Sequence, residues 1–241
     1  RIFLLSHMRA YTSLLGHILG SHPAINGYFE LHISYDETTA LADQLQELRR
    51  YEALKNNSRY LFDKLLHNRY RLRPERFDPK RFDPDRVKIL VALREPEQSI
   101  KSIVNLFARK EAGELYAQPE EAARYYIDRV GCLTEFCCTW RGRYYYFDAE
   151  SLRQEHAMLL SALTRWLDLE VPLSPHYQTF SQTGQPRKGD SSRRIHSGGI
   201  DNSLSDYSQV IIPPDTLRQA QSRYRNCRQK MIANAIDSIT P

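Results

Sequence analysis

Short apolar runs alternate along the chain with longer stretches in which apolar residues recur every three or four positions. The short runs are typical of buried strands, and the longer stretches are typical of helices with one buried face. The runs predict strands at 2–6, 24–28, 60–63, 87–93 and 143–147. The longer stretches predict helices at 12–21, 36–54, 96–110, 119–140, 149–166 and 214–236. This alternation favours an α/β fold of three layers, with a central parallel sheet between two layers of helices.

The segment before the last predicted helix departs from this alternation. Residues 172–213 are polar, rich in Ser, Gly and Arg, and show little periodicity, which is typical of a long loop. No linker divides the elements on either side of it. We therefore expect a single domain over residues 1–241.

One strand end carries residues suited to binding phosphate. Arg94 follows the strong apolar run at 87–93, and Ser102 lies eight residues later in the next predicted helix. A guanidinium with its planar set of donors and a hydroxyl together suit a phosphate. The alternative for Arg94 is an ordinary salt bridge with Glu95 or Glu97.

The first strand also runs into a polar loop and a helix, which is a second candidate phosphate site. Arg9 lies in this loop, and Thr12 and Ser13 lie where helix N–H groups and hydroxyls meet an anion. The Walker A pattern GxxxxGK[ST] is absent, and the alternative is a simple helix cap by Thr12 or Ser13. Ligands of parallel sheets bind at the carboxyl ends of the strands. Two such sites on one sheet indicate a nucleotide phosphorylated at two places.

Taken in order, several segments resemble the sulfotransferase family. The family carries a basic residue, Ser-Gly-Thr-Thr, an apolar helix, His-Pro and then Gly-x-x-Glu, and this pattern is similar to residues 9–13, 22–23 and 27–30. Arg94 and Ser102 resemble the family's pair for the 3'-phosphate of the donor. Further likeness lies in Arg187-Lys188-Gly189, in 60–64 and in 146–152.

The resemblance implies a P-loop NTPase-like sulfotransferase fold, of the bacterial, tyrosylprotein- and carbohydrate-sulfotransferase-like branch. It also implies 3'-phosphoadenosine-5'-phosphosulfate (PAPS) as the donor, with no metal. The donor-binding residues that it implies are Arg9, Ala10, Tyr11, Thr12, Ser13, Arg94, Ser102, Arg187, Lys188 and Gly189. The chain departs from the family pattern at Tyr11, which stands where the family has glycine. Because glycine lets the backbone approach a phosphate, the ring of Tyr11 must point away from the loop or stack on a neighbour.

The implied reaction is in-line sulfuryl transfer to a hydroxyl, which needs a base and cationic groups around the sulfonate. Glu30 is our choice of base, since it stands where several branches of the family carry a glutamate and a carboxylate can accept a hydroxyl proton. His32 is the rival, because its pKa is better matched and on a strand it would point to the same side as Glu30. Arg9 and Lys64 are implied to hold the sulfonate and the bridging oxygen. The alternative for Lys64 is a surface lysine.

The charge and the cysteine content of the chain limit the classes of partner and the compartment that we expect. The formal net charge of +5 attracts anions such as nucleotides or acidic glycans. The four cysteines lack the spacing of a zinc site, so we expect buried free thiols and a cytoplasmic location, or the Golgi lumen if a eukaryotic anchor has been removed. No apolar run approaches the ~20 residues of a membrane helix. We expect a hydroxyl-bearing acceptor, a carbohydrate or small alcohol, and no nucleic-acid partner.

Two other classes of protein stay open at this stage. A nucleotide-dependent kinase with an atypical phosphate loop would need a magnesium-binding aspartate at a strand end, for which Asp63 and Asp148 are candidates. A non-catalytic basic module that binds anions would spread Lys and Arg over one face, and the basic helix at 214–236 fits that pattern. Dependence on a metal separates the kinase from the sulfotransferase.

Overall fold

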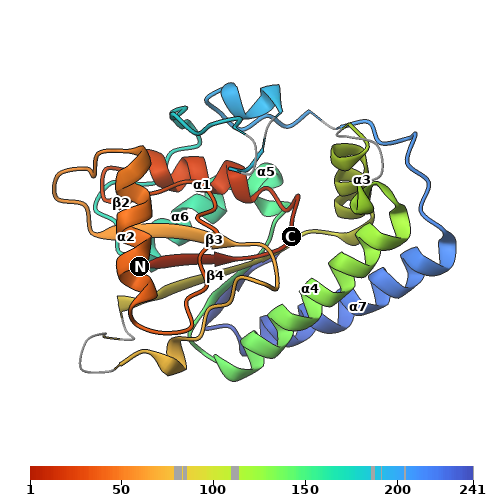
Figure 1. The fold of residues 1–241 in the computed structure, drawn as a ribbon, viewed down its shortest axis with the longest axis horizontal. Helices are drawn as coiled ribbons and strands as arrows, with labels where there is room; N and C mark the ends of the chain where they lie inside the picture. Colours follow the sequence, from red (N-terminus) through yellow and green to blue (C-terminus); the bar gives the residue numbers. More distant parts are fainter. Residues whose placement is uncertain are drawn as a thin grey trace.

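A single sheet of six parallel strands runs through the part of the chain that the computed structural model describes, residues 1–78, 83, 86–109, 114–185, 188–190, 192–203 and 205–240. The strands are β1 (Ile2–Leu5), β2 (Ile25–Asn26), β3 (Tyr60–Leu65), β4 (Lys88–Leu93), β5 (Tyr145–Asp148) and β6 (Asp237–Ile239). Their order across the sheet is β2-β3-β1-β4-β5-β6. In Figure 1 the strands run from left to right, so their carboxyl ends meet on the right-hand side.

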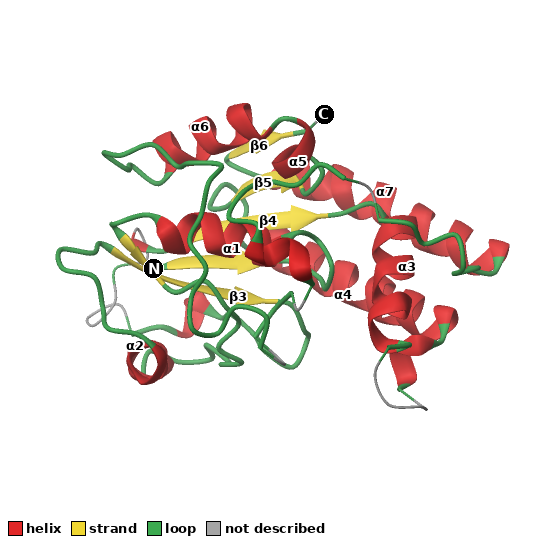
Figure 2. Ribbon diagram, turned by 90° about the horizontal axis from the view of Figure 1, so that it is seen from above, coloured by secondary structure: helices red, strands yellow, loops and turns green. Residues whose placement is uncertain are grey.

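Helices cover both faces of the sheet, as Figures 1 and 2 show. One layer holds α1 (Thr12–Ser21), α5 (Ser151–Gln154) and α6 (His156–Trp166), and the other holds α3 (Pro96–Phe107), α4 (Pro119–Thr139) and α7 (Pro214–Asn234). A further helix, α2 (Ala40–Tyr51), lies by the edge formed by β2 and β3. Single 3-10 turns occupy Pro74–Arg76, Leu115–Ala117 and Arg193–His196. Among the described residues, no helix has both the length and the apolar character of a membrane span.

Successive residues of the central strands enter two different cores, which explains the unbroken apolar runs of the sequence. On β1, Ile2 and Leu4 pack with α1 and α6, whereas Phe3 and Leu5 pack with α3, α4 and α7. Side chains alternate between the faces of a sheet, so a strand covered on both sides must be apolar at every position. The three-layer α/β architecture predicted from the sequence is therefore confirmed.

The observed elements differ from the predicted ones in three places. The helix predicted at 149–166 is two helices, because Glu155 (φ −133°, ψ 35°) leaves the helical region between α5 and α6. The strand β6 was not predicted, since its three residues include the polar pair Asp237 and Ser238 and carry no readable periodicity. The helix predicted at 36–54 is shorter and begins at Ala40.

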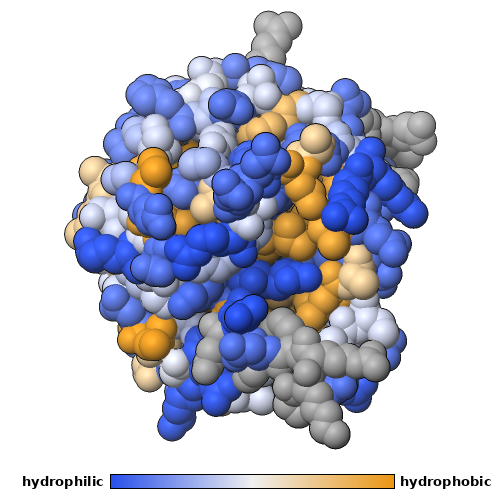
Figure 3. Space-filling model, turned by 90° about the vertical axis from the view of Figure 1, so that its left-hand side faces the viewer, coloured by the Kyte–Doolittle hydropathy of each residue, from blue (hydrophilic) through white to orange (hydrophobic). Residues whose placement is uncertain are grey.

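Figure 3 presents the side of the molecule on which the amino ends of the strands lie in Figure 1, and apolar surface lies there between charged side chains. Arg9 and most other residues predicted to bind the donor follow β1 and β4, and the other residues predicted to act in catalysis lie after β2 and near the end of β3. The predicted segment 187–189 lies in the long loop between α6 and α7. The candidate site therefore lies at the opposite end of the molecule from the view of Figure 3, along the carboxyl edge of the sheet.

Candidate active site

The loop between β1 and α1 has a strained backbone that leaves the helix N-terminus without a side-chain cap. Arg9 and Tyr11 have φ of 65° and 53°, in the left-handed region that few non-glycine residues adopt. Tyr11 is the N-cap residue, and its side chain makes no capping hydrogen bond. The alternative of a simple cap by Thr12 or Ser13 is therefore wrong. The Ser13 hydroxyl instead accepts hydrogen bonds from Lys64 Nζ and from the backbone N–H of Asp190, each at 2.9 Å.

Tyr11 takes the backbone conformation that glycine favours, and its ring packs against arginine side chains. The Cζ atom of Arg94 lies 4.3 Å from the ring centroid, and that of Arg153 lies 5.3 Å from it. Arg153 Nη1 also donates to the Tyr11 hydroxyl at 3.1 Å. A cation over an aromatic face is held electrostatically, so the ring fixes the position of the Arg94 guanidinium.

Replacing Tyr11 with Gly restores the residue that the sulfotransferase pattern carries at this position. The substitution should nevertheless weaken binding of the predicted donor nucleotide. The loss of the ring frees Arg94, and we expect the Kd of 3'-phosphoadenosine 5'-phosphate to rise about 10-fold, the equivalent of one desolvated cation–π contact. Calorimetry checks this, with Tyr11→Phe as the matched control. Phe keeps the ring and should bind like the wild type, whereas a Gly variant of undiminished affinity would contradict this role for the ring.

Arg94 is buried, and within the described part of the chain it forms no ion pair. The residue is 7% exposed, and its Nη1 donates to the backbone oxygen of Arg9 at 2.9 Å. Among the described residues, Nε of Arg94 has no hydrogen-bond partner and no carboxylate forms an ion pair with it. Glu95 instead caps α3 through the N–H groups of Glu97 and Gln98, and Glu97 pairs with Lys101 at 2.7 Å. The alternative of a salt bridge from Arg94 to either glutamate is therefore wrong.

The hydroxyl of Ser102 accepts two hydrogen bonds from residues far away in the sequence. Arg9 Nε donates to Ser102 Oγ at 2.9 Å, and the hydroxyl of Tyr207 donates to the same atom at 2.9 Å. Arg9 Nη1 lies 3.3 Å from Asp190 Oδ1. The structure thus brings Arg9, Arg94 and Ser102 to one corner of the sheet edge, and Arg9 links the two phosphate sites that the sequence predicted separately.

Lys64 lies inside β3, and its side chain is fully buried rather than on the surface. Burial lowers its pKa, which the nearby carboxylates of Glu30 and Asp190 partly oppose. The long loop at 172–213 reaches this ammonium through Gly189, whose φ is +134°. A Cβ on Gly189 would lie 2.7 Å from Ser13 Oγ and 3.0 Å from Lys64 Nζ. The absence of a side chain at Gly189 therefore permits this contact.

The other two residues of the predicted segment 187–189 are Lys188, which the structure describes, and Arg187, which it does not. Lys188 Nζ lies over the rings of Tyr51 and Phe29, at 4.2 Å and 4.8 Å from their centroids. These contacts place the ammonium beside aromatic rings of α2 and of the segment after β2. Arg187 lies outside the described residues, and its predicted role stays a prediction.

Glu30 and His32 lie together, although not for the reason that the sequence indicated. Residues 27–34 form no strand, and His32 has φ of 61°. His32 Nδ1 lies 3.6 Å from Oε1 of Glu30, a carboxylate that is 5% exposed. Burial alone would raise the pKa of Glu30, but His32 and the charge of Lys64 outweigh it and hold the pKa below its ordinary value. The carboxylate is thus ionised at neutral pH and can accept a proton.

Asp63 and Asp148, the two candidates for the magnesium-binding aspartate of a kinase, are both engaged by protein groups. Asp63 is fully buried and accepts hydrogen bonds from the N–H groups of Leu31 and Lys64 and from the hydroxyl of Tyr35. Burial raises the pKa of Asp63 to about 7. The other aspartate, Asp148, is held by Arg228 through contacts of 2.5 to 3.1 Å and accepts from Tyr146. Through the hydrogen bond that it accepts from the N–H group of Leu31, Asp63 also fixes the segment that carries Glu30.

Two residues that the sequence gave no reason to place in the site hold its framework together. Arg129 of α4 is buried and donates to the carbonyl oxygens of Ser6 at 2.8 Å and Leu65 at 2.5 Å, which ties the ends of β1 and β3 together. Burial lowers the pKa of Arg129. His7 accepts from the backbone N–H of Arg94 at 3.0 Å, and burial lowers the pKa of this imidazole to about 3. His7 is therefore a neutral structural residue.

An open groove lies away from these residues, beside the carboxyl end of β5. Its volume is about 450 Å³, and the Asp148–Arg228 ion pair forms part of its wall. The lining residues are Asp148, Glu150, Gln154, Tyr224, Arg225, Arg228 and Gln229. None of the predicted site residues lines this groove, so it is not the candidate site.

Two solved structures share this fold. The sulfotransferase domain from the curacin biosynthetic pathway superposes with a TM-score of 0.60 and 18% identity, over 94% of this chain and 96% of that chain. The sulfotransferase domain from the Synechococcus PCC 7002 olefin synthase superposes with a TM-score of 0.58 and 18% identity, over 92% and 93%. No family model and no curated protein matches the chain. The chain therefore has the fold of these sulfotransferase domains, as the sequence predicted.

Proposed function

We propose that this chain is a sulfotransferase that moves the sulfuryl group of PAPS to an acceptor hydroxyl. The observation that carries this proposal is the buried guanidinium of Arg94, whose Nε has no hydrogen-bond partner and which forms no ion pair among the described residues. Burying a charge without a partner is costly, so such a group at a sheet edge is suited to an anionic ligand. The shared fold with two sulfotransferase domains supports the same activity.

The donor carries phosphate at two places, and the site offers cationic groups at two places. Arg94 and Ser102 suit the 3'-phosphate of the donor. The uncapped N-terminus of α1, with Ser13 and the buried Lys64, suits the 5'-phosphosulfate. Ala10, Tyr11 and Thr12 complete the loop, and the segment with Gly189 closes against Ser13.

The residues of this chain would carry out the transfer by position and charge. Glu30 accepts the acceptor proton while the acceptor oxygen forms its bond to sulfur. Lys64 and Arg9 stabilise the negative charge that grows on the bridging oxygen as its bond to sulfur breaks. His32, 3.6 Å from Glu30, is the second candidate for the base. The acceptor is a carbohydrate or a small alcohol, and residues 1–241 act as one domain.

The activity is tested by incubating the purified chain with donor that is labelled in its sulfuryl group and a panel of hydroxyl acceptors. We expect label to reach an acceptor, at a rate that EDTA leaves unchanged, because Lys64 and Arg9 supply the positive charge. A reaction that needs ATP and is abolished by EDTA would identify a kinase and contradict the proposal.

A further inference from the structure

Tyr207 reaches the candidate phosphate site from a segment that carries no recognisable motif. It is half-buried, and it lies in the irregular stretch before α7. Its hydroxyl donates to Ser102 Oγ at 2.9 Å, across a separation of 105 residues in the sequence. No pattern of the sequence assigned Tyr207 a role.

Several hydrogen-bond donors gather around this hydroxyl. Ser102 Oγ accepts from both Tyr207 and Arg9, which uses both of its lone pairs and leaves its own hydrogen to donate. Arg94 Nε is a further donor that has no acceptor among the described residues. The Ser102 hydrogen and Arg94 Nε are thus donors that need an acceptor, and the oxygens of a phosphate supply acceptors.

The charges of this corner act directly on the phenol. Burial would raise the pKa of Tyr207, but hydrogen bonds to Ser102 and Ser205 and the charges of Arg9 and Arg94 outweigh it and lower the pKa. The phenol oxygen is thus within electrostatic reach of both guanidinium groups. A polarised phenol is a stronger hydrogen-bond donor to an anion.

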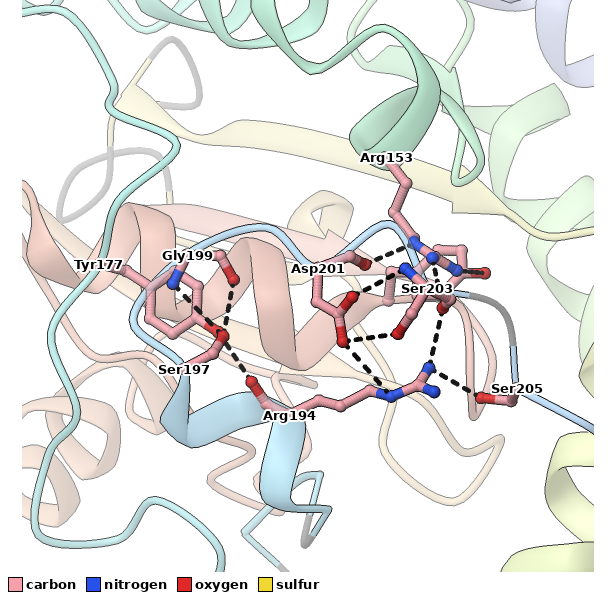
Figure 4. Close-up of polar contacts among 9 residues, drawn as sticks. Arg153, Tyr177, Arg194, Ser197, Gly199, Asp201, Ser203 and Ser205 are labelled. Carbon is pink, nitrogen blue, oxygen red and sulfur yellow. Dashed lines mark hydrogen bonds and ion pairs between the residues drawn. The ribbon is translucent and has the colours of Figure 1, made fainter.

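Two arginine side chains, Arg153 and Arg194, anchor the segment that carries Tyr207. Figure 4 shows Arg153 and Arg194 converging on this segment. Arg153 donates to the carbonyl oxygens of Asp201 and Ser203, at 3.0 Å and 2.7 Å, and Arg194 donates to that of Ser203 at 3.0 Å. Arg153 also binds the Tyr11 hydroxyl, so one side chain connects this segment to the first phosphate loop.

We propose that Tyr207 is a ligand of the ribose-bound phosphate of the donor and makes the site prefer a 3'-phosphorylated nucleotide to AMP. In the complex, a phosphate oxygen replaces Ser102 Oγ as the acceptor of the Tyr207 hydrogen. Tyr207, Ser102 and Arg94 then donate to the same phosphate. This inference rests on the proposed function, because it assumes that the donor carries such a phosphate.

The test is calorimetry of wild type and Tyr207→Phe with 3'-phosphoadenosine 5'-phosphate and with AMP. The Phe variant keeps the ring and removes only the hydroxyl. We expect its Kd for the 3'-phosphorylated nucleotide to rise about 10-fold or more, as for one hydrogen bond to a charged group, while its Kd for AMP stays unchanged.

The matched control is Tyr60→Phe. The Tyr60 hydroxyl also makes a long-range bond, to the carbonyl oxygen of Leu167 at 2.8 Å, but it lies near the amino end of β3, away from the site. This variant should bind both nucleotides as the wild type does.

Each other outcome decides the question. If Tyr207→Phe binds the 3'-phosphorylated nucleotide as tightly as the wild type or more tightly, or loses affinity for both nucleotides equally, the hydroxyl is not a phosphate ligand and the inference falls. If the wild type itself binds both nucleotides equally, the proposed function fails, and the inference fails with it.

Discussion

Replacing Glu30 with Gln should lower kcat by roughly 10²- to 10⁴-fold, the usual contribution of a general base, and leave donor binding unchanged. Gln has the shape of Glu but cannot accept the acceptor proton. Glu30 is 5% exposed, and His32 and Lys64 outweigh the effect of burial and hold its pKa below the ordinary value, so the substitution removes an ionised carboxylate. Single-turnover rates with labelled donor measure the loss, and calorimetry with 3'-phosphoadenosine 5'-phosphate shows that the site is intact.

The control for this prediction is His32→Gln together with the pH dependence of kcat/KM. The pKa of Glu30 lies below its ordinary value of 4.5, so the carboxylate is ionised above pH 4.5. The value of kcat/KM should therefore fall only below pH 4.5, as the pH drops through the lowered pKa of Glu30. An imidazole base would instead lose activity below about pH 6.5. Retained turnover in Glu30→Gln, with a large loss in His32→Gln and an acid limb near neutrality, would move the role of base to His32.

Replacing Arg94 with Ala should raise the Kd of 3'-phosphoadenosine 5'-phosphate about 100-fold or more and change that of AMP little. In the proposed complex, the guanidinium makes charge-assisted bonds to the ribose phosphate, and two of these together are expected to contribute about 3 kcal/mol or more. AMP lacks this phosphate and so loses nothing. Calorimetry with both nucleotides measures the difference.

The free energy of unfolding offers a second check on Arg94. A buried guanidinium without a counter-ion is unfavourable in the free protein, so its removal offsets the lost contacts to Arg9 and Tyr11. We expect Arg94→Ala to stay within about 1 kcal/mol of the wild type in urea unfolding. Arg59→Ala, at the exposed pair with Asp168, is the control that should leave both Kd values unchanged. Equal losses for AMP and the bisphosphate in Arg94→Ala would contradict the assignment.

The fold was predictable because its determinants are local. Strands β1 and β4 are buried on both faces and read as unbroken apolar runs, and α1 has the bounds that its periodicity predicted. The strand β6 was missed because it forms through pairing with β5 and not through its own three residues. The interruption of the helix at Glu155 was also missed, because no proline or glycine marks it in the sequence.

The candidate site was predictable only where its residues follow strands directly. Arg94 and Ser102 come after β4 on one continuous strand and helix, so their spacing carries the information. Tyr207 and Arg129 reach the site from segments with no motif, and only the folded chain brings them there. For Tyr11, the sequence predicted a ring that points away from the loop or stacks on a neighbour, and in the structure the ring packs against Arg94.

Calorimetry of the wild-type chain with 3'-phosphoadenosine 5'-phosphate, AMP and ATP, side by side and without metal, tests the central claim most directly. Because the buried Arg94 guanidinium forms no ion pair among the described residues, we expect the 3'-phosphorylated nucleotide to bind at least about 100-fold more tightly than AMP, and more tightly than ATP. Equal affinity for the three nucleotides, or a preference for ATP, would contradict the account.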